Sequence, residues 1–128
     1  MSYNIDRWIT KKLDNLIIPL AALYDESIRE GWKPDKPVIE STDNGIKVSI
    51  YLCEDGEIEG ELLPDNMLAV TRIKVRGESS GNIFYEVVEP ALRKSTGKLE
   101  AVLIWESGDS ISRLKVLDGV VTQEQVEL

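Results

Sequence analysis

The densest group of side chains with potential chemistry is a run of carboxylates in the middle of the chain. Six acidic residues and no basic residue occur between positions 54 and 65. Within this run Glu57, Glu59 and Glu61 alternate with uncharged residues. Alternate side chains of a strand project from one face at intervals of about 6.6 to 6.8 Å. The sequence therefore predicts three carboxylates in a column on one strand face, with Tyr51 of the preceding strand on the same face beside Glu59.

Such a column is compatible with several kinds of site. A hard divalent cation uses carboxylate oxygens, but calcium sites gather their ligands from a loop, and an extended strand cannot wrap around an ion. Two carboxylates about 5 to 9.5 Å apart can hydrolyse a glycosidic bond when they lie in a cleft. A column in water can dock a basic partner, or it can be a solvated sheet face that cross-strand Lys74 and Arg72 partly neutralise. We predict no metal ligand, no cofactor and no catalytic residue.

The composition restricts other chemistry. The chain has no histidine, so it has no Ser–His or Cys–His nucleophilic pair and no imidazole ligand. Residues 77–81, GESSG, match the G-x-S-x-G pattern of a nucleophile elbow, but that site needs a histidine. We interpret the segment as a turn whose hydroxyls cap a following helix. A single cysteine, Cys53, excludes an internal disulfide, and we expect neighbouring Glu54 and Asp55 to raise the pKa of its thiol.

Size and charge narrow the class of protein. The chain has 128 residues, of which 15 are basic and 23 acidic, and its net charge is −8. Its length and its 42% hydrophobic residues fit one globular domain, residues 1–128. An acidic surface repels the phosphate backbone of nucleic acids, and no run approaches the roughly 18 apolar residues of a membrane span. The N-terminus lacks the apolar core of a secretory signal. We expect a soluble cytoplasmic protein with neither a nucleic-acid nor a membrane partner.

The spacing of apolar residues near the N-terminus predicts helix. Intervals of three and four between apolar residues are typical of an amphipathic helix. We therefore predict a helical region over residues 5–28, which Pro19 kinks or divides into two short helices. The apolar positions are Ile5, Ile9, Leu13, Leu16, Leu20 and Leu23.

Period-two alternation predicts strands after position 37. Asn44-Gly45 is a hairpin signal that places a strand near residues 38–42 before the next one. A three-residue loop at positions 54–56, with Gly56 in the left-handed conformation, pairs Leu52 with Ile58.

The register of the next hairpin concerns the carboxylate column directly. A turn around Pro64 places Glu57 opposite Lys74 and Glu59 opposite Arg72.

The last third of the chain predicts a helix between residues 77 and 97, followed by a hairpin that pairs Leu103 with Leu114. Val102 and Ile104 lie on the other face of this hairpin, so that face is either covered or an interface. The last nine residues fit either a further strand or a capped helical turn.

These elements predict an α+β domain in which N-terminal helical segments pack on an antiparallel, mostly meandering sheet of about six strands, with a second helix before the last hairpin. For function we expect a non-enzymatic acidic protein-interaction domain that docks on a basic partner, as an inhibitor, a toxin-neutralising protein or an assembly subunit does. Its candidate binding residues are Glu57, Glu59, Glu61 and Tyr51. One alternative is a small carboxylate-dependent enzyme, or a domain that binds a small ligand or carbohydrate. The other is a structural homo-oligomer built through the N-terminal helical stripe or through Val102 and Ile104.

Overall fold

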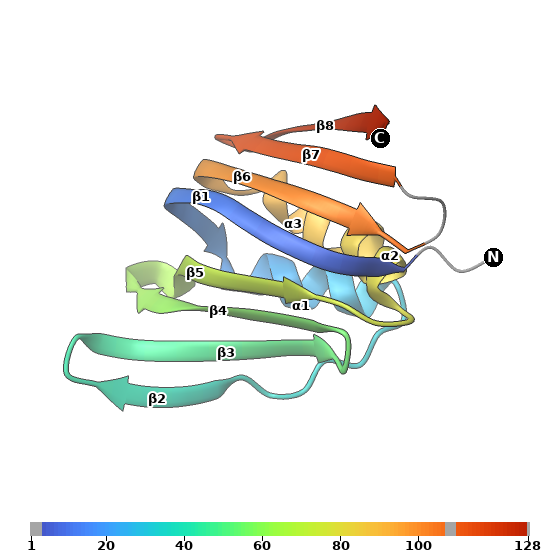
Figure 1. Cartoon of the computed structure of the whole chain (residues 1–128). Coiled ribbons are helices and arrows are strands. Elements are labelled where there is room, and N and C mark those ends of the chain that lie inside the picture. The colour runs from blue at the N-terminus through green and yellow to red at the C-terminus, as the bar shows by residue number, and fades with distance from the viewer. Residues whose placement is uncertain (1–3, 107–109, 128) are drawn as a thin grey trace.

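The protein is organised around one antiparallel sheet. The computed structural model describes residues 4–106 and 110–127. These residues form an eight-stranded sheet with the strand order β2-β3-β4-β5-β1-β6-β7-β8 (Figure 1). The strands are β1 (Ile5–Pro19), β2 (Val38–Thr42), β3 (Gly45–Cys53), β4 (Gly56–Leu63), β5 (Met67–Val75), β6 (Thr96–Trp105), β7 (Ser110–Leu117) and β8 (Val120–Glu127).

The helices lie together on one face of this sheet (Figure 1). Helix α1 spans Leu20–Arg29 and follows β1 directly. A second helical stretch consists of α2 (Ser80–Ile83), the π-helical turn η2 (Phe84–Val88) and α3 (Glu89–Leu92), and a short 3-10 turn, η1 (Pro64–Asn66), joins β4 to β5. No helix of the described residues covers the opposite face, which we call the uncovered face.

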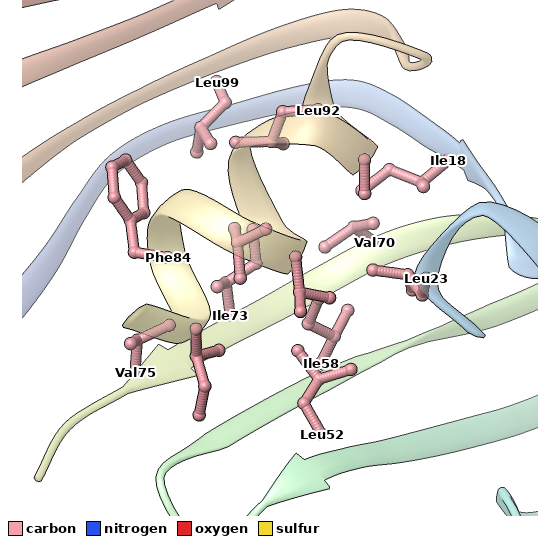
Figure 2. Packing of buried hydrophobic residues seen from close by; sticks show 14 of the residues in the cluster. Ile18, Leu23, Leu52, Ile58, Val70, Ile73, Val75, Phe84, Leu92 and Leu99 are labelled. Atoms are coloured by element: carbon pink, nitrogen blue, oxygen red, sulfur yellow. The ribbon is translucent and has the colours of Figure 1, made fainter. Parts of the chain in front are cut away.

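The hydrophobic core lies between the helices and the sheet. Figure 2 shows Leu23 of α1 and Phe84 and Leu92 of the second helical stretch in one buried cluster with Ile58, Ile73 and Leu99 of the sheet. Full burial of one such side chain contributes about 1.5 to 3 kcal/mol. Around Phe84, aromatic rings make edge-to-face contacts at centroid distances of 5.9 Å (Trp8), 5.0 Å (Tyr85) and 6.3 Å (Trp105).

The predicted N-terminal helix is wrong over residues 5–19, which form the long strand β1. Its pairing with β6 contains three register shifts, and an extra residue at a shift separates successive core-facing positions by three instead of two. The bulged strand therefore imitates the apolar spacing of a helix. Pro19 ends the strand directly before α1, and it neither kinks nor divides a helix. The shifts lie between Ile5 and Arg7, between Thr10 and Lys12, and between Asp14 and Ile17.

The predicted α+β arrangement is corrected accordingly: the protein is mostly sheet, with eight strands instead of about six. Strand β1 and the C-terminal strand β8 account for the difference. Of the two structures that fit the last nine residues, a strand and a capped helical turn, the chain forms the strand. Asp118 (φ 46°) and Gly119 (φ 83°) are both left-handed and form the tight turn that leads into β8. Strand β2 and a helical stretch between residues 77 and 97 lie where the sequence predicts them.

Two predicted registers are wrong by two residues. Ile58 pairs with Ile50 and not with Leu52, because the turn has only two residues, Glu54 and Asp55, and is preceded by a bulge in β3 between Tyr51 and Cys53. Gly56 is not left-handed. It is a buried strand residue on which a Cβ atom would lie 3.1 Å from Ile83 Cγ2, so packing against α2 shapes this turn.

The hairpin of β6 and β7 shows the same kind of error. Leu103 pairs with Ser112 and not with Leu114, and the turn itself falls on residues 107–109, outside the described part of the chain. A shift of two residues leaves every side chain on its predicted face. Trp105 Nε1 donates a hydrogen bond of 3.0 Å to Ser112 Oγ, which satisfies both buried polar groups.

A buried ion pair ties the two helical stretches together. The side chain of Glu26 in α1 is 3% exposed and lies 2.9 Å from Lys94 Nζ, just after α3, and its second oxygen contacts Arg29. Both cations are more than half exposed. The carboxylate therefore carries most of the desolvation cost, which its two partners offset.

We predict that Lys94→Met destabilises the protein by about 1 to 3 kcal/mol, because it leaves a buried carboxylate with one partner fewer. Glu26→Gln removes the buried charge itself and costs less. The double variant is then more stable than Lys94→Met alone. Urea unfolding followed by circular dichroism measures all three. A loss below about 0.5 kcal/mol in Lys94→Met, typical of an ordinary surface substitution, contradicts the prediction.

Candidate functional site on the uncovered sheet face

The three carboxylates lie on the uncovered face of β4. Ile58 and Gly60 of the same strand are buried on the helix side, so Glu57, Glu59 and Glu61 project to the other side. Glu57 and Glu59 are half-buried and Glu61 is exposed. We call these three residues the carboxylate column.

The predicted cross-strand neighbours of the column are confirmed. Glu57 pairs with Lys74 of β5, and Glu59 pairs with Arg72. The Glu59 carboxylate, however, makes its ion pair with Lys47 of β3, at 3.7 Å. Cations thus flank the column on both neighbouring strands, and the acidic stripe is one strand wide.

Tyr51 is on the predicted face but has a different neighbour. It pairs with Glu57 instead of lying beside Glu59, because the register of β3 and β4 is shifted by two residues from the predicted one. Its side chain is 37% exposed. Tyr51 and Glu57 line a hollow of about 100 Å³. Ligand pockets usually measure about 300 to 1,000 Å³, so this hollow offers little to the enzyme or carbohydrate-binding alternative.

Cys53 lies at the same end of the sheet. Burial raises the pKa of its thiol, and the nearby Asp55 and Glu54 carboxylates raise it further. The Asp55 N–H donates to the sulfur at 3.2 Å, which acts in the opposite direction. The predicted direction of the pKa is confirmed, but burial and not charge is the main cause.

The GESSG segment has a structural role that differs from the predicted one. Ser80 Oγ donates to the Gly77 carbonyl and accepts from the Ile5 N–H, both at 2.6 Å, so it fastens the start of α2 to β1. Neither serine hydroxyl caps the helix. Instead the Asp55 carboxylate accepts the Ser79 N–H at 2.7 Å.

Sequence reasoning missed a second feature of this face, a cleft between β1 and β5. The two strands pair through residues 17–19 and 67–69, and Ile5 of β1 also forms a single bridge with Gly77, two residues after β5. Between these points a space of about 290 Å³ opens, which we call the β1–β5 cleft. The residues that line it include Asp6, Arg7, Trp8, Arg72, Lys74 and Arg76.

The β5 side of this cleft could have been found from the sequence. Arg72 and Lys74 alternate along β5 and share one face, as the glutamates of β4 do, and Arg76 follows directly after the strand. The β1 side could not have been found, because residues 5–19 have the apolar spacing of a helix and Arg7 could not be placed beside β5.

Two other kinds of feature are absent from the described residues. No group of three or more acidic, cysteine or histidine side chains there has the arrangement of a metal site. No helix there is long and apolar enough to cross a membrane.

We predict that Cys53 reacts slowly with iodoacetamide near neutral pH. The thiolate is the reactive form, and a raised pKa moves its formation to a pH above the ordinary value of 9.0. The alkylation rate of the folded protein therefore rises at higher pH than the rate of the same chain in urea. Mass spectrometry across a pH series compares the two, and coincident profiles contradict the prediction.

No protein-family model matches the chain, and neither the curated proteins nor the solved structures contain a significant match.

Proposed function

We propose that this chain is a non-enzymatic protein-interaction domain that docks a basic segment of its partner on the carboxylate column and Tyr51. One observation carries the proposal: three carboxylates project at strand spacing from the face that the helices leave uncovered. Net charge complements it, because a chain of −8 attracts basic partners over a long range.

The column is held in place before a partner arrives. Strand β4 is hydrogen-bonded to β3 on one side and to β5 on the other. From the helix side, Ile58 is anchored in the core. Docking on such a strand costs little conformational entropy, so less of the favourable interaction free energy is lost on binding.

The flanking cations add selectivity. Lys47 lies on one side of the column, and Arg72 and Lys74 lie on the other. A broad basic surface would meet these cations and be repelled. A single extended segment with basic residues at every second position matches the column without touching its flanks, so the arrangement discriminates by register.

The proposal is tested by replacing the column and a matched set of acidic residues. The column variant is Glu57→Gln, Glu59→Gln and Glu61→Gln, and the control variant is Glu30→Gln, Glu78→Gln and Glu124→Gln. The control residues are exposed and lie outside the column, and each variant removes three negative charges. Proteins captured from lysate by the unmodified chain are purified and titrated by calorimetry against all three forms at low and high salt.

We expect a basic protein whose affinity falls at least tenfold in the column variant, and much less in the control. Added salt weakens binding to the unmodified chain, because it screens the exposed charges. The proposal fails if every purified partner binds the two variants equally well, or if binding is indifferent to salt.

A second candidate function rests on an apolar group at the other end of the uncovered face. Val102 lies beside Ile9, and Ile104 lies beside Ile111, all half-buried side chains on neighbouring strands. Such a group is a possible contact between copies of the chain.

This homo-oligomer is tested by Ile104→Lys and by light scattering at micromolar concentration. We expect the unmodified chain to exceed the mass of a monomer and the variant to return to it. If the unmodified chain is monomeric at these concentrations, the homo-oligomer is ruled out and the docking proposal is unaffected.

A further inference from the structure

The β1–β5 cleft is a break inside the sheet. Along it β1 is paired only with β6, and β5 is paired only with β4. In the described residues no ladder pair joins β1 to β5 between the Ile5 bridge and residue 17. The facing edges of the two strands are therefore available to a ligand as hydrogen-bonding groups.

The charge of this cleft is opposite to that of the protein. Four cations, Arg7, Arg72, Lys74 and Arg76, line it together with one carboxylate, that of Asp6. In the part of the chain that the structure describes, no carboxylate lies within 4.0 Å of any of the four cations.

The neighbouring column forms no ion pair within 4.0 Å with these cations in the described residues. Glu59 is opposite Arg72 in the ladder, yet its carboxylate pairs with Lys47 on the far side of β4. Like charges on alternate residues of one strand repel one another. An anion placed between β1 and β5 relieves that repulsion, and it gains charge-assisted hydrogen bonds from the guanidinium groups.

We propose that the β1–β5 cleft binds a small multivalent oxyanion, a molecule that carries a phosphate group or several carboxylates. Planar guanidinium forks match the paired oxygens of both groups. The space of about 290 Å³ lies at the lower end of the usual range for ligand pockets and fits a small molecule. Trp8 adds an apolar side to the lining. The inference does not require the proposed docking function, although Arg72 and Lys74 also flank the carboxylate column.

The test uses two double variants with matched charges. Arg72→Gln with Lys74→Gln removes an arginine and a lysine from the cleft. Arg113→Gln with Lys115→Gln removes the same pair of charges from the exposed side of β7, which β6 and β1 separate from β5. Pyrophosphate and citrate are titrated by calorimetry into each full-length protein, with sodium chloride keeping the ionic strength constant.

We expect saturable binding of pyrophosphate or citrate at one site. The cleft variant binds at least tenfold more weakly than the unmodified chain, and the β7 variant binds as the unmodified chain does. Binding of only one probe assigns the site to phosphates or to carboxylates. The absence of saturable binding for both probes, or an equal loss in the two variants, overturns the proposal.

A second measurement needs no substitution. Amide NMR shifts of the unmodified chain are followed during the pyrophosphate and citrate titrations. Changes concentrated in residues 6–8 and 72–76 support the cleft, and changes spread over all exposed cations of the sheet contradict it. The melting temperature of the cleft variant checks its fold.

Discussion

The pairing of β1 with β6 is the interaction on which the rest of the molecule depends. Strand β1 lies between β5 and β6 and joins the β2–β5 half of the sheet to the β6–β8 half. Its partners in β6 are far along the chain, as the pairs Ile5 with Trp105 and Leu13 with Leu99 show. Such distant pairing is entropically expensive until the helices have covered both halves from one side. The hydrophobic core therefore stabilises β1 in its central position, and β1 in turn holds together the two halves of the sheet on which the core is built.

This arrangement also explains which parts of the fold could be read from the sequence. Strands β3, β4 and β5 are consecutive and joined by short turns, so alternation alone places Glu57 opposite Lys74 and Glu59 opposite Arg72. Strand β1 fails the same reasoning because its bulges are imposed by β6, about ninety residues away. A pattern within the strand cannot reveal a partner that distorts it.

The candidate site was predictable to a similar extent. The faces of Glu57, Glu59, Glu61 and Tyr51 follow from local alternation, and they survive a register error because that error is two residues. The exact partner of Tyr51 does not follow, since Gly56 and Asp55 adapt the turn to the packing and hydrogen bonding of α2. The β1–β5 cleft required the long-range topology and was out of reach.

The overall composition does not show that charges of opposite sign lie on different strands of the sheet. Net charge describes an acidic protein, but the uncovered face presents a column of carboxylates on β4 beside a row of cations on β5. At distances near contact, solvent screens these charges only in part, because adjacent strands are about 4.8 Å apart and the Debye length at physiological salt is about 8 Å. Local fields therefore decide what each strand attracts.

The column and the cleft share Arg72 and Lys74, and this has a consequence for how the two surfaces act together. The two cations lower the negative potential over the column while they also line the cleft. An anion in the cleft would offset their charge and leave the carboxylates more attractive to a basic segment. Linkage requires the reverse as well, since a basic segment on the column would favour an anion in the cleft by the same factor. Two ligands of opposite charge on neighbouring strands would thus strengthen each other through shared electrostatics, without any movement of the sheet.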